Sequence, residues 1–128
     1  MMNQQNNTRH ILIVDDDYVI RNMMTDVLEL EAPDIPVQLA RNGREALQFL
    51  QGEGRYLVFL DLMMPQMDGS EVCQALDERP HLRSQHIIVL MSAMDKLAEA
   101  SALNVDTTMP KPFTVDDIMR ILQRYLNN

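Results

Sequence analysis

The chain has 128 residues, 46% of them hydrophobic, which is enough for one globular domain with a buried core. Its formal net charge of -8 disfavours binding of this domain to the phosphate backbone of a nucleic acid. The single cysteine, Cys73, cannot form a disulfide framework and favours a reducing cytoplasm, and no apolar run approaches the ~20 residues needed for membrane insertion.

The first residues read differently from the rest of the chain. Residues 1–8 are rich in asparagine and glutamine and contain no apolar region like that of a signal peptide. We expect them to form a disordered tail, and we expect residues 9–128 to form a single domain. Met1 at the start and the short tail after the last predicted helix favour a complete protein over a fragment.

Five short apolar runs follow, and they alternate with segments of helical spacing. The runs at residues 11–14, 57–60 and 87–91 are apolar at every position, which is typical of strands covered on both faces in a parallel sheet. The runs at 37–40 and 105–109 are weaker, and we interpret them as the second and fifth strands.

The segments between these runs carry helix start signals. Candidate helix caps precede three of them, namely Asp17, Asn42 (with Glu45 in a candidate capping box) and Thr114 (with Asp117 in another). Two further helices should start near Ser70 and Asp95, which makes five helices in all. The pattern predicts an α/β fold of (βα)5 type, a single doubly wound five-stranded parallel sheet that is flavodoxin-like, with strand order 2-1-3-4-5.

Polar residues collect at the carboxyl ends of the predicted strands, where open α/β sheets bind their ligands. Asp15 and Asp16 follow the first strand and Asp61 follows the third. Ser92 follows the fourth strand, and Lys111 follows the fifth. Because the strands are short and parallel, we expect these side chains to meet in one crevice.

The residue types in this crevice suit phosphoryl chemistry. Crowded carboxylates repel one another, and a hard cation such as Mg²⁺ relieves that cost while keeping positions for water and phosphate. A remaining carboxylate can attack phosphorus, and Asp61 is the best candidate because it ends a central strand beside the acidic pair. Of the three equatorial oxygens of the transition state, Mg²⁺ could take one, Lys111 another, and the Ser92 hydroxyl or nearby backbone N–H groups the third.

Each of these residues also has a simpler explanation when it is considered alone. Asp17 and Ser92 could be helix caps, and Lys111 could be a solvated surface lysine. The specificity comes from the combination, because four strand ends carry one chemically compatible set of groups.

The motifs that carry this set resemble a known family, the receiver domains of two-component response regulators. They are ILIVDD at 11–16, DLMMPQMDG at 61–69, SA at 92–93 and KPF at 111–113. The resemblance covers essentially the whole chain after Thr8.

The resemblance implies a role for each matching residue. Asp61 is the phosphoacceptor, Asp16 binds Mg²⁺ directly, and Asp15 acts mainly through water. The backbone carbonyl of Met63 is the remaining metal ligand. Ser92 supplies the hydroxyl that contacts the phosphoryl group. Lys111 neutralises the charge of the phosphoryl group, and its peptide bond to Pro112 is expected to be cis.

The resemblance also implies a function and partners. The donor would be a sensor histidine kinase or a histidine phosphotransfer protein, and the output would be contact with a downstream protein in the cytoplasm. The domain would be a phosphorylation-activated switch with self-catalysed phosphotransfer and dephosphorylation, and not a turnover enzyme. An alternative within the class is a receiver fragment of a larger response regulator or hybrid kinase.

The sequence departs from the family pattern in two respects. Thr108 stands three residues before the lysine, where a switch aromatic is usual, so the usual route of activation is in doubt. Met63 and Met94 occupy the positions two residues after the phosphoacceptor and two after the hydroxyl, which usually tune dephosphorylation.

Two rival functions fit the residues less well. An Mg²⁺-dependent phosphatase with an aspartyl intermediate would need a second carboxylate two residues after Asp61, where Met63 stands. A flavodoxin-like cofactor binder would need a phosphate-cradling loop after the first strand, where Asp15 and its acidic neighbours would repel phosphate.

Overall fold

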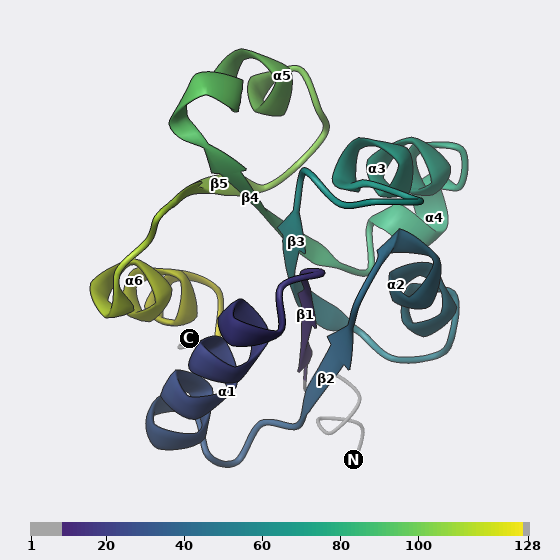
Figure 1. The fold of residues 1–128 in the computed structure, drawn as a ribbon. Coiled ribbons are helices and arrows are strands. Elements are labelled where there is room, and N and C mark those ends of the chain that lie inside the picture. Colours follow the sequence, from purple (N-terminus) through teal and green to yellow (C-terminus); the bar gives the residue numbers. More distant parts are fainter. Residues whose placement is uncertain (1–8, 127–128) are drawn as a thin grey trace.

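The computed structural model describes residues 9–126, so the predicted tail at residues 1–8 lies outside the described residues. Within the described part, five parallel strands form one sheet in the order β2-β1-β3-β4-β5, which confirms the predicted topology (Figure 1). The strands are β1 (His10–Val14), β2 (Val37–Ala40), β3 (Tyr56–Asp61), β4 (Ile87–Ala93) and β5 (Thr107–Lys111).

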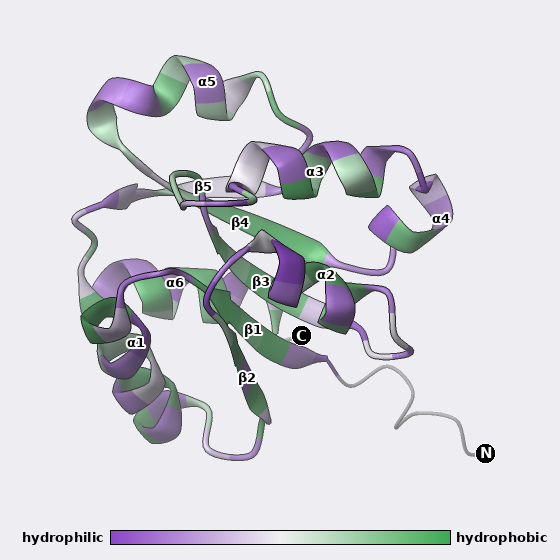
Figure 2. Ribbon diagram, turned by 45° about the vertical axis from the view of Figure 1, so that its right-hand side comes forward, coloured by the Kyte–Doolittle hydropathy of each residue, from purple (hydrophilic) through white to green (hydrophobic). Residues whose placement is uncertain are grey.

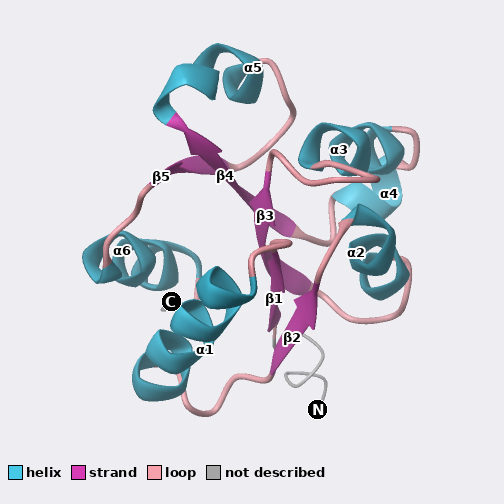
Figure 3. Ribbon diagram, viewed as in Figure 1, coloured by secondary structure: helices cyan, strands magenta, loops and turns pink. Residues whose placement is uncertain are grey.

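Helices connect successive strands (Figure 3). They are α1 (Tyr18–Glu31), α2 (Gly43–Leu50), α3 (Gly69–Asp77), α4 (Pro80–Arg83), the 3₁₀ helix η2 (Met94–Lys96), α5 (Leu97–Ser101) and α6 (Val115–Tyr125). Within residues 9–126, no helix combines the length and the apolarity that a membrane span requires.

The sheet lies between two layers of helices, because alternate strand residues point to opposite faces. Leu12 and Val58 pack in a core with α2 and α3, whereas Ile11 and Phe59 pack in a second core with α1 and α6. The central strand β3 contributes to both cores, and all six of its residues are buried. Figure 2 shows the resulting pattern, with apolar central strands and helices that are polar on their outer sides.

All three predicted cap residues cap their helices, but only one of the two predicted capping boxes is complete. The Asp17 carboxylate accepts the N–H of Val19 and begins α1, and Thr114 forms the expected reciprocal capping box at α6. The expected box at α2 is only half formed. Asn42 accepts the N–H of Glu45, but the Glu45 carboxylate bonds the N–H of Arg41 instead, because it also forms an ion pair with the Arg41 guanidinium.

The largest differences from the prediction are the position of the fifth strand and an additional helix. The fifth strand runs over Thr107–Lys111 and not over 105–109. The Asp106 N–H donates to the Ile88 carbonyl at 2.9 Å, but the Ile88 N–H donates to the Asp106 carboxylate at 2.7 Å and not to a backbone carbonyl, so the regular ladder starts after Asp106. The extra helix α4 was also missed. Its first residue, Pro80, lacks the N–H that a continued α3 would need, so the chain starts a new short helix.

Candidate functional site

Three carboxylates meet at the carboxyl edge of the sheet. β1 and β3 are neighbours with Val14 level with Leu60, so the residues that follow, Asp15 and Asp61, also lie side by side. One carboxylate oxygen from each of Asp15, Asp16 and Asp61 lies within 4.8 Å of the others. Asp15 and Asp61 are buried, whereas Asp16 is exposed to solvent. The three carboxylates that were predicted to meet therefore form one cluster in the structure.

Lys111 brings a positive charge to the same place from the edge strand β5. Its side chain reaches across β4 and β3, and its Nζ lies 2.8 Å from Asp15 Oδ2 and 3.3 Å from Asp61 Oδ1. Burial alone would lower the pKa of Lys111, but its hydrogen bond to Asp15 and the charges of both carboxylates outweigh that effect and raise it. Lys111 is therefore a fixed cation within the site and not a solvated surface lysine.

The Asp61 carboxylate is held in an unfavourable environment for its negative charge. Burial, with the neighbouring charge of Asp15, raises the pKa of Asp61 from 3.8 to about 6. Lys111 and the backbone N–H of Met63 act in the opposite direction but do not cancel the rise. A bound cation would remove this cost, and an all-oxygen set of ligands is the kind that Mg²⁺ prefers.

Ser92 supplies a buried hydroxyl at the end of the adjacent strand. It lies inside β4, so it is not a helix cap, and its neighbour Met91 is paired with Asp61. The residue is only 1% exposed, and its Oγ has no hydrogen-bond partner among the residues that the structure describes. A buried hydroxyl without a partner is costly, and an oxygen of a bound ligand could accept its hydrogen.

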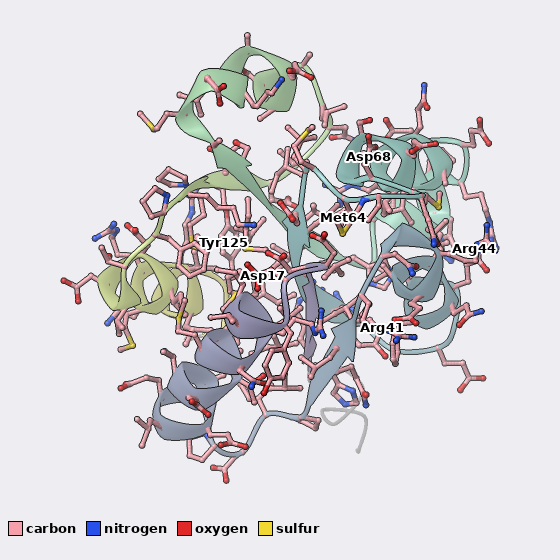
Figure 4. All side chains as sticks on the ribbon, viewed as in Figure 1. Asp17, Arg41, Arg44, Met64, Asp68 and Tyr125 are labelled. Atoms are coloured by element: carbon pink, nitrogen blue, oxygen red, sulfur yellow. The ribbon has the colours of Figure 1, made fainter. Side chains whose placement is uncertain are left out.

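Two contacts that hold Asp15 in place were not predicted from the sequence. Its Oδ1 accepts the backbone N–H of Asp17 at 2.9 Å, at the point where β1 turns into α1 (Figure 4). Its backbone carbonyl accepts a hydrogen bond from the Arg21 guanidinium at 2.8 Å. The position of Arg21, four residues after the Asp17 cap on the first turn of α1, was the only signal for this role.

Two methionines lie in the segments that follow β3 and β4, Met63 in a loop and Met94 at the start of η2. Met63 follows β3 and has a side chain that is 55% exposed, and Met94 follows β4 and is 64% exposed. Neither side chain is part of the hydrophobic cores, so both thioethers are open to solvent.

The peptide bond between Lys111 and Pro112 is cis, as the resemblance implied.

A second hollow lies away from the carboxylates. A cavity of about 520 Å³ between β5 and α6 is lined by Thr108, Pro110 and Arg124, among others, and none of the three site carboxylates belongs to its lining. Thr108, which stands in place of the usual aromatic, is exposed on this edge strand. The carboxylates and Lys111 therefore lie at the strand ends and not in this cavity.

The family is decided by comparison with known proteins. The family model described as the response regulator receiver domain matches residues 11–123. The chain belongs to this family. The matched segment contains every residue of the crevice, and receiver domains of response regulators are parts of a signalling switch.

Individual relatives and solved receiver structures agree with this assignment. The chain is 33% identical over 123 residues to response regulator MprA of Mycolicibacterium vanbaalenii, a match that covers 91% of this chain and 49% of the relative. It thus spans about half the length of the curated relatives that it matches.

Among solved structures, the chemotaxis response regulator CheY4 of Vibrio cholerae is 28% identical, with a TM-score of 0.78 and coverage of 93% of this chain and 99% of that one. The signal receiver domain of a histidine kinase from Syntrophus aciditrophicus is 26% identical, with a TM-score of 0.74 and coverage of 94% and 95%. This receiver domain therefore has the fold that its family membership implies.

Proposed function

We propose that this receiver domain accepts a phosphoryl group on Asp61 and signals through the phosphorylated form. One observation carries the proposal. A buried carboxylate lies 3.3 Å from a fixed ammonium group, beside two further carboxylates at the same edge of the sheet. Near the end of the adjacent strand, the buried Ser92 hydroxyl has no hydrogen-bond partner among the described residues. These groups are what a phosphoryl acceptor needs around its nucleophile.

The residues present fit a magnesium ion. Asp16 would hold it directly, Asp61 and the backbone carbonyl of Met63 would complete the protein ligands, and Asp15 would act mainly through water. The fit rests on the all-oxygen donor set and on the cost of an ionised Asp61, because burial and the charge of Asp15 raise the pKa of that carboxyl. When bound, Mg²⁺ would neutralise the negative charge of the carboxylates and of a phosphoryl oxygen.

Phosphotransfer to Asp61 forms one bond to phosphorus and breaks another. A carboxylate oxygen of Asp61 attacks phosphorus and forms an O–P bond. The P–N bond to the donor histidine breaks, and its electron pair stays on the imidazole nitrogen. Lys111 and the Ser92 hydroxyl stabilise the negative charge on the phosphoryl oxygens. The rate comes from positioning and charge in the receiver itself, so the chemistry is self-catalysed.

The donor class follows from this step. A sensor histidine kinase or a histidine phosphotransfer protein would supply the phosphoryl group, in the cytoplasm, and a downstream protein would bind the phosphorylated form. Because the chain spans about half the length of its curated relatives, the proposed activity is that of the receiver domain. It holds equally for a separate receiver and for the receiver part of a larger regulator or hybrid kinase.

The proposal is tested by incubating the protein with acetyl phosphate and Mg²⁺ and measuring its intact mass. We expect one added phosphoryl group with Mg²⁺ and none in EDTA. Equal labelling in EDTA would contradict the role given to the metal. Sustained release of phosphate from a phosphomonoester, with catalytic turnover, would instead favour the phosphatase alternative, which Met63 argues against because it lacks an acid–base group.

The lifetime of the phosphorylated state should be long. Hydrolysis needs a water in line with the bond from Asp61 to phosphorus, and Met63 and Met94 offer no hydrogen bond to hold it. A positioned water is worth about one to a few kcal/mol of barrier, or roughly tenfold or more in rate. We therefore expect Met63→Asn combined with Met94→Glu to speed the loss of the phosphoryl group about tenfold.

The measurement is the decay of phosphorylated protein in excess Mg²⁺ after the donor is removed. Met119→Gln, on α6 and outside the site, is a matched control that should decay like the wild type. If the double variant decays no faster than the control, the two methionines do not set the lifetime.

A further inference from the structure

The loop between β3 and α3, residues 62–68, carries Met63 and is held at several points by backbone hydrogen bonds. Figure 4 labels two of its residues, Met64 and Asp68. At its start, the Leu62 N–H donates to the Met91 carbonyl at 2.9 Å, and the Gly69 N–H closes the loop onto the Leu62 carbonyl at 3.0 Å. Between these ends, Gln66 is the one non-glycine residue of the described part with a positive φ, 65°. The loop therefore has a defined and partly strained path.

The far side of this loop is fixed by another element. The N–H of Gly43, the first residue of α2, donates to the Met67 carbonyl at 2.9 Å. α2 lies beside α3 in the structure, so this bond joins the start of one helix to the loop that leads into the next (Figure 1). It is made four residues after Met63, whose carbonyl is a proposed metal ligand.

Gly43 is required here by space and not by backbone conformation. It is buried and helical, and no glycine of the described residues has a positive φ, so any residue could adopt its backbone angles. A Cβ at this position, however, would lie 2.5 Å from the Met67 carbonyl oxygen and 2.7 Å from Val72 Cγ2. The carbonyl is backbone, so it cannot move unless the loop moves with it.

We propose that Gly43 is a positioning residue for the metal site, acting through the loop that presents the Met63 carbonyl. The inference rests on the proposed function, because it takes the Met63 carbonyl as a ligand of Mg²⁺. A side chain at residue 43 pushes the Met67 carbonyl outward, and the displaced loop shifts the Met63 carbonyl only four residues away. Metal affinity then falls although residue 43 itself contacts no metal ligand.

A purely structural role predicts a different result. If the contact served only packing, Gly43→Ala would change stability equally with and without Mg²⁺. If the neighbouring side chains moved aside, Gly43→Ala could even stabilise the protein, since alanine is favoured over glycine in a helix. A change in the dissociation constant for Mg²⁺ is the readout that separates positioning from packing.

The experiment measures Mg²⁺ binding by calorimetry for the wild type, Gly43→Ala and Gly52→Ala. We expect binding to Gly43→Ala to be roughly tenfold weaker, as is usual when groups behind a metal ligand are disturbed. Gly52→Ala is the matched control, because a Cβ there meets only the Phe49 carbonyl, at 3.3 Å, far from the site. Unchanged Mg²⁺ affinity in Gly43→Ala would overturn the inference.

Two further measurements keep the test decisive. Val72→Ala added to Gly43→Ala removes the clash with Val72 Cγ2 but leaves the clashes with the Met67 carbonyl oxygen and the Met67 Cγ, so Mg²⁺ affinity should stay low. Full recovery would overturn the role of Met67 and its loop. In the unaltered protein, Mg²⁺ should shift the amide resonance of Gly43 and slow its hydrogen exchange, because linkage is reciprocal. A Gly43 amide that does not respond to Mg²⁺ would also overturn it.

These outcomes are separable from those of the proposed function. A protein that binds Mg²⁺ and shows the Gly43 response but takes no phosphoryl group would overturn the phosphotransfer proposal alone. A protein that takes the phosphoryl group normally, with Mg²⁺ affinity insensitive to residue 43, would overturn the positioning role alone.

Discussion

Replacing Asp61 by asparagine should abolish Mg²⁺-dependent labelling by acetyl phosphate. The amide has no negative charge and its oxygen is a poor nucleophile, so the rate should fall by roughly 10³-fold or more, as for the loss of other catalytic nucleophiles. The fold should persist, because asparagine has nearly the same shape as aspartate. The measurement is the intact mass after incubation with the donor, followed by mapping of the labelled peptide in the wild type.

Asp17→Asn is a suitable control for this variant. Asp17 follows the acidic pair directly, but it is exposed and caps α1, and asparagine caps a helix as well as aspartate does. Its labelling should match that of the wild type. Full labelling of Asp61→Asn would overturn the assignment of the phosphoacceptor, and labelling at Asp16 in that variant would show that the neighbouring carboxylate can substitute.

The same substitution should stabilise the metal-free protein above about pH 6. The pKa of Asp61 rises from 3.8 to about 6 on folding, chiefly through burial and then through the charge of Asp15. At about 1.4 kcal/mol per tenfold change, this costs on the order of 3 kcal/mol once the group is ionised in both states. An asparagine side chain carries no charge, and its N–H groups can donate to the neighbouring carboxylates.

The stability that Asp61→Asn gains over the wild type should depend on pH, because Asp61 binds its proton more tightly in the folded state. Below pH 3.8 Asp61 is protonated in both states and costs nothing. Between 3.8 and about 6 the folded state holds more protons than the unfolded state, so this contribution to stability is lost as the pH rises through that range. The difference between Asp61→Asn and the wild type should grow over that range and then level off.

His86 affects the wild type with the opposite sign. Its buried ring accepts the Tyr56 N–H at Nδ1, and burial lowers the pKa of His86, so its contribution is lost as the pH falls below the ordinary value near 6.5. Because His86 is present in both proteins, its effect cancels in the difference between them.

The measurement is denaturant unfolding in EDTA from pH 4 to pH 8, together with thermal melting at pH 7. A gain of about 3 kcal/mol corresponds to a rise of roughly 10 °C for a domain of this size. Asp16→Asn should also raise the melting temperature, but by less, because Asp16 is exposed and water screens its charge. Mg²⁺ should stabilise the wild type more than Asp61→Asn.

Two outcomes would contradict the prediction that the buried carboxylates destabilise the metal-free protein. If Asp61→Asn is no more stable than the wild type at pH 7 in EDTA, Lys111 already compensates the buried carboxylate fully. If neither Asp61→Asn nor Asp16→Asn gains stability, the carboxylates do not crowd one another in solution.

Much of this protein follows from local patterns in the sequence. Strands buried on both faces must be apolar at every position, so the cores of β1, β3 and β4 could be read directly. Parallel strands joined by helices end at one edge, so Asp61 and its partners could be placed together before their distances were known. The predicted position of the weaker fifth strand was wrong by two residues. The start of this strand depends on Asp106, and its partner Ile88 is distant in sequence.

Other features were decided only by the tertiary structure. The ion pair of Lys111 with Asp15 joins residues 96 positions apart, and its length depends on the twist of the sheet between β5 and β1. The raised pKa of Asp61 depends on how deeply both helix layers bury the strand end. The contact of Gly43 with Met67 depends on how closely α2 approaches a loop, and sequence periodicity describes faces but not such distances between elements.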